Sequence, residues 1–169
     1  MKPLSKALLF TAMGFSFPTA AHTVGIVDSV REGTAAYVDI NRAMADGYGL
    51  FLGCTSGPQE GAMGVHFANG ALVGDGTLDS RRPEVLMYER TPDGRMRFVG
   101  VEFVVIAEAW DATHSGAPVL EGQLFHFTGA PNRYGLPPFY ALHVWAWKKN
   151  PNGTFADWNP NVTCDHYSG

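Results

Sequence analysis

Apolar side chains recur at helical spacing in the N-terminal third of the chain. Over residues 34–48 they fall on one side of a helix, at Tyr37, Ile40, Met44 and Tyr48. Charged side chains lie on the opposite side, and the glycines that follow can end a helix. The pattern therefore predicts one amphipathic helix over residues 34–48.

After this helix the pattern changes to short strands separated by turns. The segments with strand patterns are residues 63–67, 83–89, 95–106 and 139–148, with a short return at 155–158. A Thr-Pro-Asp-Gly turn at residues 91–94 joins the second and third of these segments. It predicts a hairpin in which Glu89 lies opposite Met96 and Met87 lies opposite Phe98.

This register assigns a face to each residue of the hairpin. The residues predicted to share one face are Val85, Met87, Met96, Phe98, Glu102 and Val104. Because both faces of residues 95–106 are largely apolar, we expect this strand to be central and buried. Residues 111–138 are rich in Gly, Pro and aromatic side chains, which predicts a long loop.

Together these elements predict an α+β fold. We expect one N-terminal amphipathic helix packed on an antiparallel, strongly twisted sheet or partly closed β-barrel. The length of 169 residues suits a single domain, and no internal repeat or low-complexity linker divides the chain.

The first 21 residues have the three-part layout of a secretory signal peptide. Lys2 and Lys6 give a basic start, residues 7–17 form an uncharged and mostly apolar run, and residues 18–21 suit cleavage by signal peptidase. The apolar run is too short to span a bilayer, which takes about 20 residues. We therefore predict a signal peptide over residues 1–21 and a single mature domain over 22–169, exported to the periplasm or the extracellular space.

The net charge and the cysteine content restrict which partners and which cellular compartment are expected. The formal net charge is −4 and no basic stripe is present, so neither nucleic acid nor an anionic membrane surface is an expected partner. The only cysteines are Cys54 and Cys164. In an oxidising compartment such a pair is expected to form a disulfide, and the lack of C-x-x-C spacing makes metal binding by these residues less favoured.

Three polar residues interrupt strands that are otherwise apolar: His66, Glu102 and His143. A buried carboxylate is costly unless it is paired or bound to a cation, and two imidazoles with one carboxylate are ligands for Zn, Fe or Mn. Glu84 and Glu89 could supply a further oxygen or support the ligands. The alternative is a structural polar cluster that holds the sheet together through hydrogen bonds.

Two further groups of residues are candidates for binding. Cleavage after residue 21 would leave His22 with a free α-amine, and the imidazole and amine together suit Cu(II). A pocket under the predicted loop could be lined by Phe125, Phe127, Arg133, Tyr134 and Phe139. The alternatives are a plain terminus and a loop that packs its own aromatic side chains on the sheet.

Several segments together resemble small exported bacterial proteins of uncharacterised function. They are GAMGVHF, RPEVLMYE, VGVEF, LHVWAW, NPNGTF and WNP. The resemblance implies export but no activity. We expect a binding module with a metal or ligand site on one face of the sheet. The cofactor expected for a metal site is a divalent transition metal. The alternatives are a metal-dependent enzyme, hydrolytic or oxygen-activating, that uses His66, Glu102 and His143, and a structural or interaction domain without metal.

Overall fold

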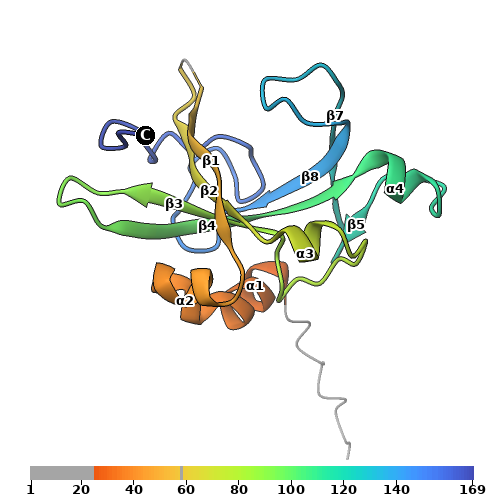
Figure 1. Ribbon diagram of the computed structural model, residues 1–169, viewed down its shortest axis with the longest axis horizontal. Coiled ribbons are helices and arrows are strands. Elements are labelled where there is room, and N and C mark those ends of the chain that lie inside the picture. The colour runs from red at the N-terminus through yellow and green to blue at the C-terminus, as the bar shows by residue number, and fades with distance from the viewer. Residues whose placement is uncertain (1–24, 58) are drawn as a thin grey trace, which may run out of the picture.

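The computed structural model describes residues 25–57 and 59–169 and has an α+β fold built on a curled antiparallel sheet (Figure 1). The strands, in spatial order, are β1 (Gly49–Ser56), β2 (Ala62–Ala68), β3 (Val85–Arg90), β4 (Met96–Ile106), β8 (Phe139–Val144) and β7 (His126–Thr128). The predicted signal peptide and His22 lie outside the described residues. Within the described ranges, no helix combines the length and hydropathy needed to cross a bilayer.

The helical segment differs from the single helix predicted over residues 34–48. Its elements are α1 (Ile26–Thr34), the 3₁₀ helix η1 (Ala35–Val38) and α2 (Ile40–Ala45). Asp39 has extended backbone and its carboxylate accepts a hydrogen bond from the Asn41 N–H at 3.0 Å, so it starts a new helix instead of continuing the old one. Ala43 and Tyr48 are buried, whereas Met44 is exposed.

Helices α1 and α2 cover one face of the sheet (Figure 1). The buried apolar side chains of this core include Val30, Val65, Leu86, Tyr88, Phe98, Val101, Phe103, Leu142 and Val144. Each large apolar side chain that is fully buried contributes roughly 1.5–3 kcal/mol. This helix-side core therefore supplies much of the stability of the fold.

The predicted register of the β3–β4 hairpin is wrong by one residue near the turn. The Thr91 N–H donates to the Arg95 carbonyl at 2.8 Å, so the loop has three residues, and Gly94 adopts a left-handed φ of 81°. Such loops need glycine at the left-handed position. As a result Glu89 lies opposite Arg97 instead of the residue before it.

Some of the faces predicted for the residues of this hairpin are wrong, because β4 contains a β-bulge at Val99. Tyr88 lies opposite Phe98, whereas Met87 lies opposite Gly100, so Val99 is the extra residue of β4. Phe98 consequently packs in the helix-side core and Val99 packs on the other face. Beyond the bulge, the alternation continues with its phase shifted by one residue.

The segment predicted as a long loop, residues 111–138, contains several short elements. The helix α4 (Ala107–Asp111) leads into it, β5 (Val119–Leu120) and β6 (Gln123–Leu124) form a separate hairpin, and β7 is the edge strand of the main sheet. The short helix α3 (Gly70–Val73) follows β2. The sheet curls, so that β1 and β2 on one side and β8 and β7 on the other rise from the face opposite the helices (Figure 1). We call this second face, which lines a cavity, the hollow face.

The predicted disulfide is confirmed. Cys54 of β1 is bonded to Cys164, with a Cα–Cα distance of 5.6 Å and a sequence separation of 110. In place of the predicted return strand at 155–158, Asn159 makes an isolated bridge to Ala62, with a hydrogen bond in each direction at 3.2 Å. The C-terminal segment is thereby fixed across the hollow face of the sheet.

We expect reduction of this disulfide to lower the stability markedly. A loop of this length restricts the unfolded chain by roughly 4–5 kcal/mol in the chain-entropy model. Thermal melts with and without reductant, repeated on the double variant Cys54→Ser and Cys164→Ser, measure the effect. Reductant should not change the melting temperature of the variant, and equal melting temperatures for oxidised and reduced parent protein would refute the expectation.

Candidate functional site

His66, Glu102 and His143 project from the hollow face of the sheet. Successive side chains of a strand point to opposite faces. The neighbours of Glu102 on β4, Val101 and Phe103, belong to the helix-side core, and the neighbours of the two histidines do the same on β2 and β8. The helix-side packing therefore fixes the direction of all three polar side chains.

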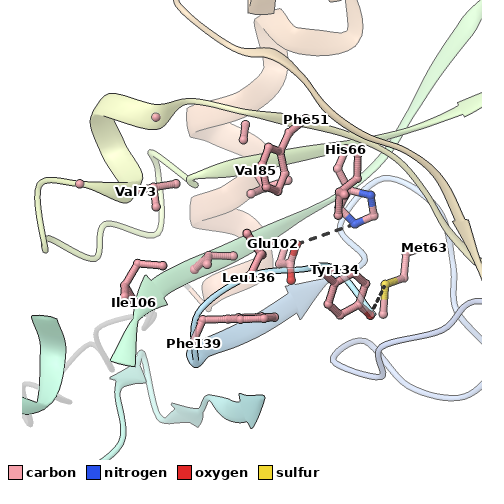
Figure 2. Close-up of a pocket in the computed structure, with 15 residues that line it drawn as sticks. Phe51, Met63, His66, Val73, Val85, Glu102, Ile106, Tyr134, Leu136 and Phe139 are labelled. Atoms are coloured by element: carbon pink, nitrogen blue, oxygen red, sulfur yellow. Dashed lines mark hydrogen bonds and ion pairs between the residues drawn. The ribbon is translucent and has the colours of Figure 1, made fainter. Parts of the chain in front are cut away.

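The curl of the sheet brings these side chains together although β3 separates β2 from β4. Glu102 lies directly opposite His143 on the adjacent strand. In a flat sheet, residues two strands apart are separated by roughly 9–10 Å. Here the Nε2 atom of His66 lies 3.8 Å from Oε2 of Glu102 (Figure 2), and Nε2 of His143 lies 3.8 Å from Oε1 of the same carboxylate.

The three groups are close to one another without being hydrogen-bonded to one another. Each residue has one nitrogen or oxygen atom that could bind a metal, and these three atoms lie within 4.8 Å of one another. The separations of 3.8 Å exceed hydrogen-bond length. Both histidines are buried, with 2% of His66 and 3% of His143 exposed. Nδ1 of His66 and Nε2 of His143 are buried and have no hydrogen-bond partner among the described residues, which is uncommon for polar groups in protein interiors. Nδ1 of His143 lies 3.3 Å from Oδ1 of Asp157, but outside hydrogen-bond geometry.

Burial and mutual charge set the protonation of the cluster. Burial, with a smaller contribution from the charge of His143, lowers the pKa of His66 to about 3, so that His66 is neutral at physiological pH. Burial also raises the pKa of Glu102, an effect that His143 partly opposes. For His143, burial disfavours protonation, but the carboxylates of Glu102 and Asp157 outweigh it and raise the pKa.

Asp157 is a member of the site that the sequence pattern did not predict. Its Oδ1 atom lies 3.3 Å from Nδ1 of His143 and 3.5 Å from Nδ1 of His126, an exposed residue on β7. The interaction with His143 lowers the pKa of Asp157. The only sequence signal was the return segment at 155–158, which follows the strand that carries His143. A carboxylate that accepts a hydrogen bond from a ring nitrogen fixes the orientation of a metal-binding histidine, and Asp157 lies within reach of this role.

Glu84 and Glu89, for which a supporting role is predicted, hydrogen-bond to groups outside the cluster. Oε2 of Glu84 accepts a hydrogen bond from the Val104 N–H at 3.0 Å. Glu89 accepts from Nζ of Lys148 at 2.6 Å and from the Thr163 N–H at 3.2 Å. These hydrogen bonds tie both carboxylates to neighbouring segments, and their role toward His66 and His143 stays a prediction.

A cavity of about 330 Å³ adjoins the cluster on the side of His66 and Glu102 (Figure 2). Its apolar lining comes from Phe51, Leu52, Met63, Ala68, Val73, Val85, Val104, Ile106, Leu136 and Phe139. Tyr134 also lines it, and its hydroxyl faces the sulfur of Met63 at 3.9 Å. Glu102 thus lies near both histidines and also lines a largely hydrocarbon chamber.

Of the five residues predicted to line a pocket under the loop, Tyr134 and Phe139 line this cavity. The other three are not among the residues that line it. Phe125 is buried in the helix-side core, and Phe127 is 59% exposed. Arg133 donates to the Ser56 carbonyl at 3.0 Å and lies over the rings of two aromatic neighbours.

The buried carboxyl of Glu84 should make stability depend on pH. Burial raises its pKa from the ordinary 4.5 to about 8, so the folded protein keeps a proton that the unfolded chain releases. The free energy of unfolding should therefore fall as pH rises between these values, by at most about 1.4 kcal/mol per pH unit. We expect Glu84→Gln to remove this decline, as measured by urea unfolding between about pH 5 and pH 8.

The glutamine keeps an oxygen that accepts from the Val104 N–H, so the comparison isolates the titration of Glu84. Other titrating groups, Glu102 included, contribute to both proteins alike. The same pH dependence of unfolding in parent and variant would show that Glu84 has an ordinary pKa.

Comparison of the chain with protein-family models, with curated proteins and with solved structures finds no significant match. The function is therefore argued from the geometry of the site.

Proposed function

We propose that this protein binds a divalent transition-metal ion through His66, Glu102 and His143. The observation that carries the proposal is the convergence of three ligand atoms, from three strands, to within 4.8 Å of one another. Ligands of one ion lie about 3–4 Å apart when each is about 2.0–2.2 Å from the metal. The separations of 3.8 Å from Glu102 to each histidine are in this range.

The donor set and its surroundings support a transition metal over calcium or magnesium. Two imidazoles and one carboxylate suit Zn²⁺, Fe²⁺ or Mn²⁺, whereas calcium and magnesium prefer oxygen ligands. Histidine must be neutral to bind a metal, and burial keeps His66 in that form. Asp157 lies behind Nδ1 of His143, as the carboxylate of a carboxylate–histidine–metal arrangement does.

We also propose that the protein works in the periplasm or outside the cell. The disulfide between Cys54 and Cys164 supports an oxidising compartment. The predicted signal peptide over residues 1–21 is the sequence feature that points the same way.

Elemental analysis and calorimetry test the metal site. Protein purified without chelator should contain about one equivalent of a divalent transition metal, and chelator-treated protein should rebind Zn²⁺. His66→Ala and His143→Ala should each weaken Zn²⁺ binding at least about a hundredfold. Asp157→Asn should weaken it by about 10–100-fold, because that carboxylate orients a ligand without binding the metal.

His114→Ala is the matched control, since that histidine is exposed and stacks on Trp110 away from the cluster. It should bind Zn²⁺ as the parent does. Circular dichroism of each variant separates loss of the site from loss of the fold. A folded parent protein that neither contains nor binds a metal would leave the structural polar cluster as the remaining explanation.

A metal-dependent enzyme is the second candidate function, and the adjoining cavity favours it. Three protein ligands leave a coordination position open, and catalytic metal sites keep such a position for water or substrate. The cavity of about 330 Å³ reaches His66 and Glu102, so a small molecule there would be next to the metal.

The open position is the property that separates this enzyme from a closed metal site. If it exists, azide should bind to Co²⁺-loaded protein and change its visible absorption spectrum. Ala71→Phe, an exposed substitution outside the cavity, should leave that change intact. A Co²⁺ spectrum that azide does not alter would exclude the enzyme candidate and keep the binding role.

A further inference from the structure

We propose that the cavity beside His66 and Glu102 binds an apolar small molecule with a single hydroxyl group, which donates its hydrogen bond to the Glu102 carboxylate. This site adjoins the proposed metal site but does not depend on a bound metal. The class of ligand follows from the size of the chamber, the nature of its walls and the position of its polar groups.

The size of the cavity limits the ligand to a small molecule. A cavity of about 150 Å³ lined by Leu, Ile and Phe is large enough for benzene. The present cavity, at about 330 Å³, has roughly twice that volume. It therefore fits a ligand with on the order of 10–15 non-hydrogen atoms, such as an alkylphenol or a medium-chain alcohol.

The walls favour hydrocarbon over polar groups. Val85, Val104 and Ile106 line the chamber from the sheet, and Leu136 and Phe139 close it from the segment that leads into β8. A ligand with several polar groups would lose their hydrogen bonds to water without gaining others on these walls. The body of the ligand is therefore apolar.

The polar groups in the lining select the head group. Glu102 is buried except for 12% of its side chain, and His66 lies beside it. A hydroxyl is able to donate to the carboxylate. A carboxylate head would instead bring a second negative charge against Glu102, and an ammonium head would lose its hydration inside hydrocarbon walls. A hydroxyl is thus the head group that the chamber accepts at least cost.

Access to the chamber is from the side of β1 and α3. Phe51 lines the cavity and is 49% exposed, so the wall reaches the surface there. Gly70 also lines it, and a Cβ atom built on this glycine would have no neighbour within 4 Å. This rim leaves room for a ligand to pass and for a larger side chain to obstruct it.

Calorimetry with three matched probes on chelator-treated protein tests the head group. The probes are para-butylphenol, butylbenzene, which lacks the hydroxyl, and para-butylbenzoate, which carries a charge. We expect para-butylphenol to bind at least about tenfold more tightly than either of the others. Glu102→Gln should reduce the preference for the phenol over butylbenzene. Equal affinity for all three probes, or no binding of the phenol, would overturn the proposal.

Two substitutions test the location of the ligand. Ala68→Phe fills the chamber from β2, and Gly70→Leu obstructs its rim, so each should weaken para-butylphenol binding at least about tenfold. Ala71→Phe adds the same ring to the exposed side of α3 and should leave binding unchanged. If Ala68→Phe does not fold, Gly70→Leu decides the matter. Unchanged binding in folded Gly70→Leu would place the ligand elsewhere and overturn the proposal.

These experiments test the metal-site proposal and the cavity proposal independently of each other. Chelator-treated protein that binds para-butylphenol supports the cavity whether or not the protein binds Zn²⁺. Protein that binds Zn²⁺ but not the phenol retains the metal site and overturns the cavity proposal. Gly70→Leu should still bind Zn²⁺ with the affinity of the parent, because residue 70 is not among the three ligand residues.

Discussion

The curvature of the sheet is the constraint on which the site depends. His66 and Glu102 belong to strands that do not touch, and their side chains meet only because the hollow face of the sheet closes over β3. The bulge at Val99 adds local bend and twist, as bulges do. Gly64 of β2 has a φ of 94°, and a Cβ atom there would lie 2.5 Å from the Tyr88 carbonyl oxygen, so β2 and β3 approach closely at this point. A flat sheet of the same sequence would keep His66 apart from Glu102 and His143.

The two faces of the sheet divide stability from chemistry. The helix-side face buries a continuous set of apolar and aromatic side chains under α1 and α2. The hollow face buries a carboxylate between two imidazoles, an arrangement that costs free energy unless the charges are well paired or bound to a cation. The helix-side core and the disulfide offset that cost. Under the proposed function, a bound cation would supply the pairing that the carboxylate of Glu102 lacks.

The local sequence pattern predicted the features that depend only on neighbouring residues along the chain, such as the burial and the face of a strand residue. Apolar residues flank His66 in an obvious strand, so its burial and its face followed from alternation, and the same holds for Glu102 and His143. The register of the hairpin did not follow, because the three-residue loop and the bulge at Val99 each add a residue to the count. Strands β1 and β7 also escaped prediction: each is an edge strand with exposed apolar residues. Asp157 was missed because only tertiary structure brings its segment to β8.

Glu102 links the two proposed sites, since one carboxylate faces both the histidines and the chamber. A molecule in the cavity that donates a hydrogen bond to this carboxylate changes how strongly the carboxylate attracts a metal ion. By thermodynamic linkage, the metal changes the affinity for that molecule by the same factor. Whether the metal strengthens or weakens binding of the molecule depends on which oxygen of Glu102 each of them contacts. Oε2 faces His66 and Oε1 faces His143. A hydroxyl that donates to Oε2 competes with a metal held by both histidines. A hydroxyl that instead enters the open coordination position would bind more tightly when the metal is present.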